Sequence, residues 1–142
     1  MVYYLNDEAI GKKRAFLYWL AETMRATEQV RAQRGVLSAL AEERMLHLAL
    51  ECVTDLGNLV IDGFMMRDPS SYEDIIEILR MEEVMDADTA NGLLELVRLR
   101  RALLQEYADW DRERMHPLFQ RLAEIIVAFA DQVAAYVEAN RL

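Results

Sequence analysis

The sequence predicts an all-α protein, and two features of its composition carry this prediction. Leu, Ala, Glu, Arg and Met dominate the 142 residues, and these residue types favour helices. The five glycines and two prolines leave little material for the turns of an all-β fold. With 54% hydrophobic residues, a chain of this length is expected to fold as one domain, residues 1–142, around one packed core.

The first two helices are expected to be long. Asn6 or Asp7 can cap a first helix that extends to about residue 32, and Gly35 then marks a turn. A second helix is expected over about 37–64, which corresponds to roughly 40 Å at 1.5 Å per residue. The Arg-Asp-Pro sequence that follows should stop this helix, because proline lacks the backbone donor that a helix needs.

A short third helix is predicted for the stretch SSYEDIIEIL, residues 70–79. Ser70 with Glu73, or Ser71 with Asp74, has the spacing of a capping box ahead of an apolar run. The two serines are therefore alternative starting points for the same helix.

Two further helices complete the predicted architecture. Asp86 or Asp88 can cap a fourth helix that extends to about residue 108. The fifth is expected to begin near residue 111 or, with Pro117 in its first turn, at His116. Four long helices and one short helix then form a bundle, with a crossover segment between the second and the fourth.

Charge and cysteine content limit the partners and the location of the protein. A formal net charge of −9 argues against a broad nucleic-acid-binding or anionic-membrane-binding surface, since both require an extended positive field, and neither DNA nor a membrane is expected as a partner. Cys52 is the only cysteine and is expected to be buried and reduced. The N-terminus has no signal-peptide pattern, and charged residues interrupt the longest apolar segment, so a soluble cytoplasmic protein is expected.

Basic residues nevertheless gather in one part of this acidic chain. Five arginines lie within 17 positions around the junction of the last two predicted helices: Arg98, Arg100, Arg101, Arg112 and Arg114. Two interpretations are open, a local basic site or an ordinary solvated charged face.

Arg100 occupies an unusual place on the predicted fourth helix. At 100° per residue, Arg100 and Tyr107 share one stripe with a set of apolar residues that should face the core: Leu93, Leu96, Val97, Leu103 and Leu104. An arginine that is buried even in part needs a partner, because an unpaired charge costs several kcal/mol. The sequence therefore predicts a specific partner for Arg100.

The predicted second helix offers such partners along one polar line. The line contains His47, Glu51, Thr54, Asp55, Asn58 and Asp62, while nearly every other position from 45 to 61 is apolar. It either faces solvent or forms an internal seam or the floor of a cleft. In the second case, Glu51 and Asp55 are the expected partners of Arg100, and His47, Glu51, Asp55 and Asn58 form a supporting polar network.

Common catalytic motifs are absent from the sequence. A carboxylate-bridged di-metal bundle needs two Glu-x-x-His pairs, and the chain offers one, Glu113 with His116. His47 and Glu51 supply only two potential ligands, which do not close a zinc site. No Gly-rich phosphate loop or nucleophile motif is present. We therefore expect neither a metal ion nor a cofactor.

Three stretches together resemble a known family. They are ALECVTDLGNLVIDGF (49–64), RDPSSYEDIIEILRMEEVM (67–85) and ELVRLRRALLQEY (95–107), and they are similar to the HepT-like ribonuclease toxins of the HEPN superfamily, in particular the YutE-like branch. The family signature is Arg, four residues, His, one residue, Tyr, on the fourth helix of a bundle that forms a symmetric homodimer. Arg100 and Tyr107 match this signature, Gln105 stands in place of the histidine, and Arg101 replaces the asparagine that often follows the arginine.

The resemblance implies a function and a site. The function is metal-independent cleavage of RNA in a cleft at the dimer interface, with Arg100, Gln105 and Tyr107 at the catalytic positions. Arg100 and Arg101 would bind RNA phosphate. The resemblance also implies a toxin–antitoxin system, in which a partner nucleotidyltransferase adenylylates the tyrosine of the motif, here Tyr107.

Gln105 affects the expected reaction but not the family resemblance. A glutamine amide cannot transfer a proton, whereas histidine does so near neutral pH. Loss of general acid–base catalysis typically costs 10²–10⁴-fold in rate, so the ribonuclease activity is expected to be weak or lost. Two alternatives have the same fold: a dimeric, non-catalytic module that binds RNA or nucleotide, and a protein-interaction module in which Arg100 and Tyr107 belong to a structural polar network.

Overall fold

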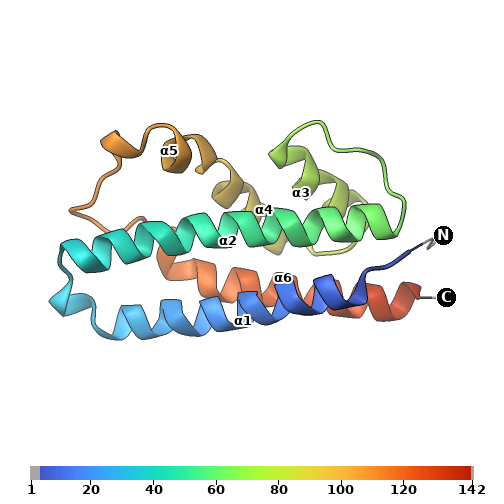
Figure 1. Ribbon diagram of the computed structural model, residues 1–142, viewed down its shortest axis with the longest axis horizontal. Coiled ribbons are helices and arrows are strands. Elements are labelled where there is room, and N and C mark those ends of the chain that lie inside the picture. The colour runs from blue at the N-terminus through green and yellow to red at the C-terminus, as the bar shows by residue number, and fades with distance from the viewer. Residues whose placement is uncertain (1–3, 142) are drawn as a thin grey trace.

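A computed structural model describes residues 4–141 and confirms the all-α prediction (Figure 1). The predicted domain of residues 1–142 extends beyond this range, and residues 1–3 and 142 lie outside the described part. The three long helices are α1 (Asp7–Gln29), α2 (Val36–Gly63) and α6 (Phe119–Asn140). The shorter elements are α3 (Tyr72–Met81), α4 (Ala87–Val97), α5 (Arg100–Leu104) and the 3₁₀ turns η1 (Arg31–Gln33) and η2 (Tyr107–Asp109).

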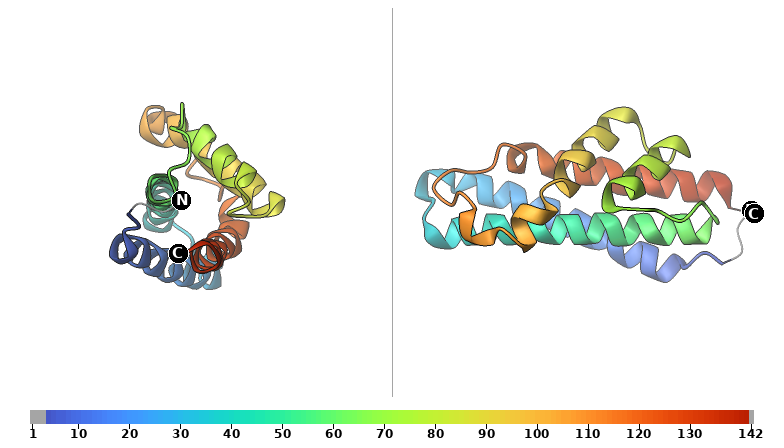
Figure 2. Two further views of the ribbon diagram at one scale, coloured as in Figure 1. Left: turned by 90° about the vertical axis from the view of Figure 1, so that its right-hand side faces the viewer. Right: turned by 90° about the horizontal axis from the view of Figure 1, so that it is seen from above.

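The three long helices pack side by side, and the shorter ones cover one side of them. α1 contacts both α2 and α6, while α3 packs on α2 and α4 packs on α6. Figure 2 shows α3, α4 and α5 beyond α2 as seen from α1. Both ends of the described chain lie at the same end of the bundle, where Arg141 Nη2 binds Asp7 Oδ1 at 2.8 Å. No helix within residues 4–141 is long and apolar enough to cross a membrane.

Side-chain caps begin three of the helices, and the structure decides between the predicted alternatives. Asn6, rather than Asp7, caps α1, and Asp86, rather than Asp88, caps α4. Ser71 caps α3. Each cap accepts a hydrogen bond from the backbone N–H three residues later, which satisfies a donor that the first helical turn leaves unpaired.

Close packing fixes α3 against α2. A Cβ atom on Gly57 of α2 would lie 2.8 Å from Ile75 Cγ2 and 3.1 Å from Leu79 Cδ1. Only a residue without a side chain therefore allows this approach. The core around the contact is apolar, with Leu56 and Ile76 among its fully buried residues. This packing sets the position of α3 and of its first residue, Tyr72.

The predicted fourth helix is shorter than expected. α4 ends at Val97, a turn follows at residues 98–99, and α5 contains only five residues before the chain leaves the helical path at Gln105. The predicted core-facing stripe is confirmed for Leu93, Leu96, Val97 and Leu103, which are buried, but it is wrong for Tyr107. α5 packs on α2 and buries Leu103, whereas the side chain of Tyr107 is exposed. Tertiary packing outweighs local helix propensity here, because no glycine or proline marks the break.

The ends of the first and last helices also differ from expectation. α1 ends at Gln29, and the chain continues through η1. α6 begins at Phe119, later than both predicted starting points, and the segment before it forms a loop. In that loop, His116 Nδ1 accepts a hydrogen bond at 3.1 Å from the backbone N–H of Leu118, while its ring stacks on Trp110. Burial lowers the pKa of His116 and favours the neutral ring that this bond requires.

A buried ion pair connects the α1–α2 turn to the loop before α6. Glu42 on α2 is only 5% exposed, and both of its carboxylate oxygens lie 3.1 Å from Arg34 Nε. Arg34 Nη1 also donates to the backbone oxygen of Glu113 at 2.8 Å. This charged pair therefore joins the start of α2 to a loop that is 79 residues away in the sequence.

Candidate functional site

Arg100 is the first residue of α5 and is half-buried without an ionic partner. Its guanidinium carbon lies 4.3 Å from the centre of the Tyr72 ring, in the range of a cation–π contact. Its Nε atom is buried and has no hydrogen-bond partner. Among the described residues, no carboxylate lies within ion-pairing distance of Arg100. No carboxylate of the described residues therefore neutralises the positive charge of this arginine.

The predicted pairing of Arg100 with Glu51 or Asp55 is wrong. Asp55 instead lies 3.1 Å from Lys13 Nζ, and Glu51 lies 3.5 Å from His47 Nε2. Both carboxylates line a groove of about 560 Å³ between α1 and α2. Glu51 and Asp55 of the polar line therefore face this groove, and the ring of Tyr72 on α3 lies beside Arg100 instead.

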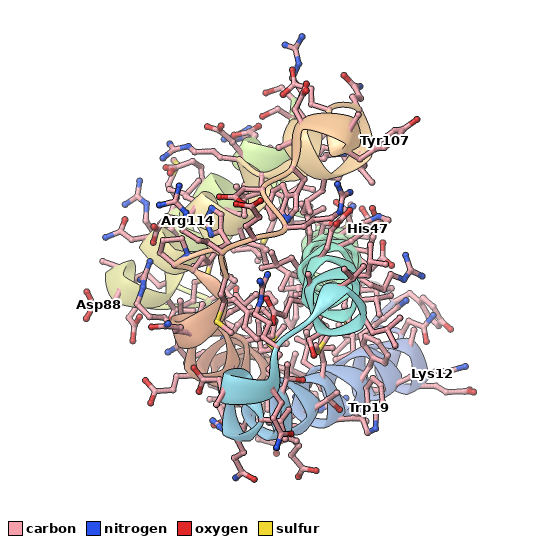
Figure 3. The ribbon with its side chains drawn as sticks, turned by 90° about the vertical axis from the view of Figure 1, so that its left-hand side faces the viewer. Lys12, Trp19, His47, Asp88, Tyr107 and Arg114 are labelled. Atoms are coloured by element: carbon pink, nitrogen blue, oxygen red, sulfur yellow. The ribbon has the colours of Figure 1, made fainter. Side chains whose placement is uncertain are left out.

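Only part of the predicted supporting network forms contacts. His47 is in contact with Glu51, and its Nδ1 atom lies 3.0 Å from Arg44 Nη1. Asp55 is bound separately by Lys13, and Asn58 is exposed. In Figure 3, His47 lies on the same side of the bundle as Tyr107 of η2 and Trp19 of α1. The polar line thus forms part of an open face rather than an internal seam.

Gln105 and Tyr107 follow α5 and are exposed. Gln105 caps the C-terminal end of α5 through its backbone, and its side chain lies in solvent. Tyr107 begins η2 and is 57% exposed. Its phenol points away from the bundle in Figure 3. The structure therefore brings the three motif residues into one short segment, with Arg100 turned inward and the other two outward.

A clamp that the sequence did not reveal holds this segment on α2. Arg112 Nε and Nη2 donate to the two carboxylate oxygens of Glu43 at 2.8 and 3.0 Å. Arg112 Nη2 also donates to the backbone oxygen of Tyr107 at 2.8 Å. Arg112 belongs to the predicted basic cluster, but its partner lies 69 residues away, and no local signal identifies it. The clamp fixes the backbone beside Tyr107 and leaves the phenol free.

The five clustered arginines differ in their partners. Four of them contact carboxylates: Arg98 with Glu73, Arg101 with Glu106, Arg112 with Glu43 and Arg114 with Asp111. Arg101 is strongly exposed, so its pair with Glu106 contributes little to stability. Arg100 alone in this group lacks such a partner within residues 4–141. The predicted basic site thus reduces to one unneutralised arginine with an exposed arginine next to it in the sequence.

No metal-binding arrangement accompanies these residues. Within residues 4–141, the structure holds no group of three or more His, Cys, Asp or Glu side chains suited to a metal ion. Cys52 is buried beside Lys13, with Sγ 3.3 Å from the backbone oxygen of that lysine, and burial raises the pKa of its thiol to about 11. A thiol with this pKa is a poor nucleophile at neutral pH.

Comparison with known proteins identifies the family. The family model described as Ribonuclease HepT-like matches residues 15–133. A curated protein of Bacillus subtilis (strain 168) named "Putative RNase YutE" is 36% identical over 102 residues, which cover 72% of this chain and 71% of that protein.

Solved structures agree with this result. A structure of YutE from Bacillus subtilis, described as a cytosolic protein of unknown function, has a TM-score of 0.85 at 30% identity and covers 98% of this chain and 95% of its own. A tri-AMPylated HEPN toxin of Shewanella oneidensis, in complex with its MNT antitoxin, has a TM-score of 0.78 at 17% identity, with 92% and 98% covered, and so shares the fold. The chain belongs to the HepT-like ribonuclease family.

Proposed function

We propose that this protein acts on RNA as a toxin-type member of its family, and that Arg100 binds the RNA phosphate. The observation that carries the proposal is the half-buried guanidinium of Arg100, which has no carboxylate partner among the described residues. A guanidinium fork matches the geometry of phosphate oxygens. Because an unpaired, partly buried charge is unfavourable, a bound phosphate would stabilise this arrangement.

Gln105 sets the expected level of cleavage. Its exposed amide can donate and accept hydrogen bonds near a bound RNA, but it cannot act as a general base or acid. We therefore propose a ribonuclease whose phosphate binding is retained and whose turnover is weak or lost. The reaction in this proposal uses neither metal nor cofactor, and the protein acts in the cytoplasm. A non-catalytic RNA-binding module is the alternative, distinguished by binding without any cleavage.

Replacement of Arg100 tests the binding step. Arg100→Ala is expected to weaken the binding of a fluorescein-labelled single-stranded RNA by about tenfold or more, measured by fluorescence anisotropy. Removal of one phosphate contact should also lower the dependence of log K on log salt by about one unit. Arg101→Ala should have a smaller effect, since Arg101 is exposed and already pairs with Glu106.

Arg121→Ala is the matched control for this experiment. Arg121 is an exposed arginine that pairs with Glu95, and its loss should leave RNA binding nearly unchanged. Thermal unfolding of Arg100→Ala should stay within about 2 kcal/mol of the wild type, because no ion pair is broken. Equal RNA binding by Arg100→Ala and the wild type would contradict the proposal. A stability loss of about 3–5 kcal/mol with unchanged binding would favour a structural role instead.

The proposal includes a homodimer and a nucleotidyltransferase antitoxin that modifies Tyr107. Large apolar side chains are exposed on α1 and α2, among them Trp19 at 55% and Leu37 at 84%, which favours a protein contact through these helices. The exposed phenol of Tyr107 is open to an incoming enzyme. Sedimentation at micromolar concentration should show a dimer. A monomer would contradict the proposed homodimer. Intact-mass spectrometry after co-expression with a nucleotidyltransferase should show adenylyl additions that Tyr107→Phe removes. An unchanged mass of the wild type would contradict the proposed modification of Tyr107.

A further inference from the structure

We propose that Tyr72 is a positioning residue that holds the guanidinium of Arg100 with its edge toward the RNA phosphate. This inference rests on the proposed function of Arg100 as a phosphate ligand. Tyr72 lies on α3, outside the Arg-Gln-Tyr motif, and its ring centre is 4.3 Å from the guanidinium carbon. In this role Tyr72 does not contact the RNA itself but fixes the orientation of the Arg100 guanidinium that binds the phosphate.

Stacking leaves the binding capacity of the arginine intact. The five N–H donors of a guanidinium lie in its plane, so a ring against the flat face occupies none of them. A carboxylate in the same place would neutralise the charge and take up the donors. Two other half-buried arginines lose donors in this way, since Arg34 binds Glu42 and Arg112 binds Glu43. A third, Arg14, lies over the Tyr18 ring and donates to the Tyr18 hydroxyl and the Ala130 backbone oxygen. An aromatic partner is therefore the kind of contact that holds Arg100 and still leaves it free to bind an anion.

Tyr72 is itself rigidly placed. It is the first residue of α3, directly after the cap Ser71. Asp74 in the same turn accepts hydrogen bonds from Arg67 Nη1 and Nη2 at 2.6 and 2.7 Å and from the Ser70 backbone N–H at 2.8 Å. These donors, the Arg67 guanidinium first, hold the pKa of the Asp74 carboxyl well below its usual range. These contacts thus fix the backbone of the turn that carries Tyr72.

A second contact joins the same turn of α3 to the other side of the α4–α5 break. Glu73 Oε1 lies 3.3 Å from Arg98 Nε, and Arg98 directly follows the last residue of α4. Consecutive residues of α3 therefore contact Arg98 before the break and Arg100 after it. Both side chains of the Arg98–Glu73 pair are more than half exposed, so the pair contributes little to the stability of the fold. After the break, the Arg100 guanidinium lies over the Tyr72 ring of α3.

Substitutions at Tyr72 that keep or remove the ring test this inference. Tyr72→Phe keeps the stacking surface and should bind single-stranded RNA within twofold of the wild type. Tyr72→Leu removes the ring and should weaken binding by about tenfold. In the double variant with Arg100→Ala, Tyr72→Leu should add no further loss, because its effect passes through Arg100. Met81→Ala, at the exposed end of the same helix, controls for a general weakening of α3.

A second measurement reports on the arginine without RNA. The Nε–Hε signal of Arg100 in a ¹H–¹⁵N spectrum should be displaced by the Tyr72 ring, keep its position in Tyr72→Phe and move in Tyr72→Leu. Unchanged signal and unchanged RNA binding in Tyr72→Leu would overturn the inference while the proposed function stands if Arg100→Ala still weakens binding. If Tyr72→Leu moves the signal but Arg100→Ala binds RNA like the wild type, the proposed function fails, and the positioning role for RNA fails with it.

Discussion

Gln105→His is expected to raise the rate of RNA cleavage by about 100-fold or more over the wild type. Histidine restores a group that transfers protons near neutral pH, and general acid–base catalysis typically contributes 10²–10⁴-fold. The substitution should not disturb the fold, because the Gln105 side chain is exposed at the end of α5. The measurement is single-turnover cleavage of an end-labelled RNA in the presence of EDTA, which removes contaminating metal-dependent nucleases from the comparison.

Two controls accompany this prediction. Gln105→Asn cannot transfer a proton either and should remain at the wild-type rate. Cleavage by Gln105→His should depend on pH with an inflection near the ordinary histidine pKa of about 6.5, and the wild type should lack this inflection. If histidine at this position gives no more cleavage than asparagine, the site does not use a proton-transfer group at residue 105, and the proposed reaction is wrong.

Glu42→Ala is expected to reduce the free energy of unfolding by about 3–5 kcal/mol. Glu42 is buried and binds Arg34 through both carboxylate oxygens. Its removal leaves the poorly exposed guanidinium of Arg34 without its anion, at the point where the α1–α2 turn meets the loop before α6. For a domain of this size, such a loss lowers the melting temperature by about 10 °C. Urea denaturation followed by circular dichroism measures the change.

Glu95→Ala is the matched control for the buried pair. Glu95 also pairs with an arginine, Arg121, but both side chains are about half exposed, so its loss should change the stability by no more than about 1 kcal/mol. The double variant Arg34→Ala with Glu42→Ala should recover part of the loss, because it removes the uncompensated charge. Equal effects of Glu42→Ala and Glu95→Ala would show that burial does not govern the strength of these pairs.

Local signals in the sequence predict much of the fold. The cap of α3 lies three residues from the N–H that it binds, and α2 departs from its predicted bounds by one residue at each end. Such features depend on neighbours along the chain, which the sequence displays directly. The break between α4 and α5 has no such signal. The residues beside the break contact Tyr72 and Glu73 on another helix, and Leu103 is buried, and none of these contacts is visible from the neighbouring sequence.

In the candidate site, too, the sequence indicates local features but not contacts between distant segments. The family pattern indicates Arg100, Gln105 and Tyr107, which already lie in one short stretch of the sequence, and the structure adds that Arg100 is half-buried while the other two are exposed. A helical wheel identifies the polar face of one helix but not the element that packs against it. The predicted partners Glu51 and Asp55 therefore proved to face the groove between α1 and α2. The aromatic platform and the clamp on the Tyr107 backbone became visible only when distant segments came together.

RNA cleavage by Gln105→His with and without Arg100 tests the central claim most directly, namely that Arg100 supplies the phosphate contact of a ribonuclease-type site. Both proteins carry the same restored histidine, so a difference between them reports on the arginine alone. In EDTA, Gln105→His should cleave a labelled RNA, and the double variant Arg100→Ala with Gln105→His should fall to the background rate. A double variant that cleaves as fast as Gln105→His would contradict the account.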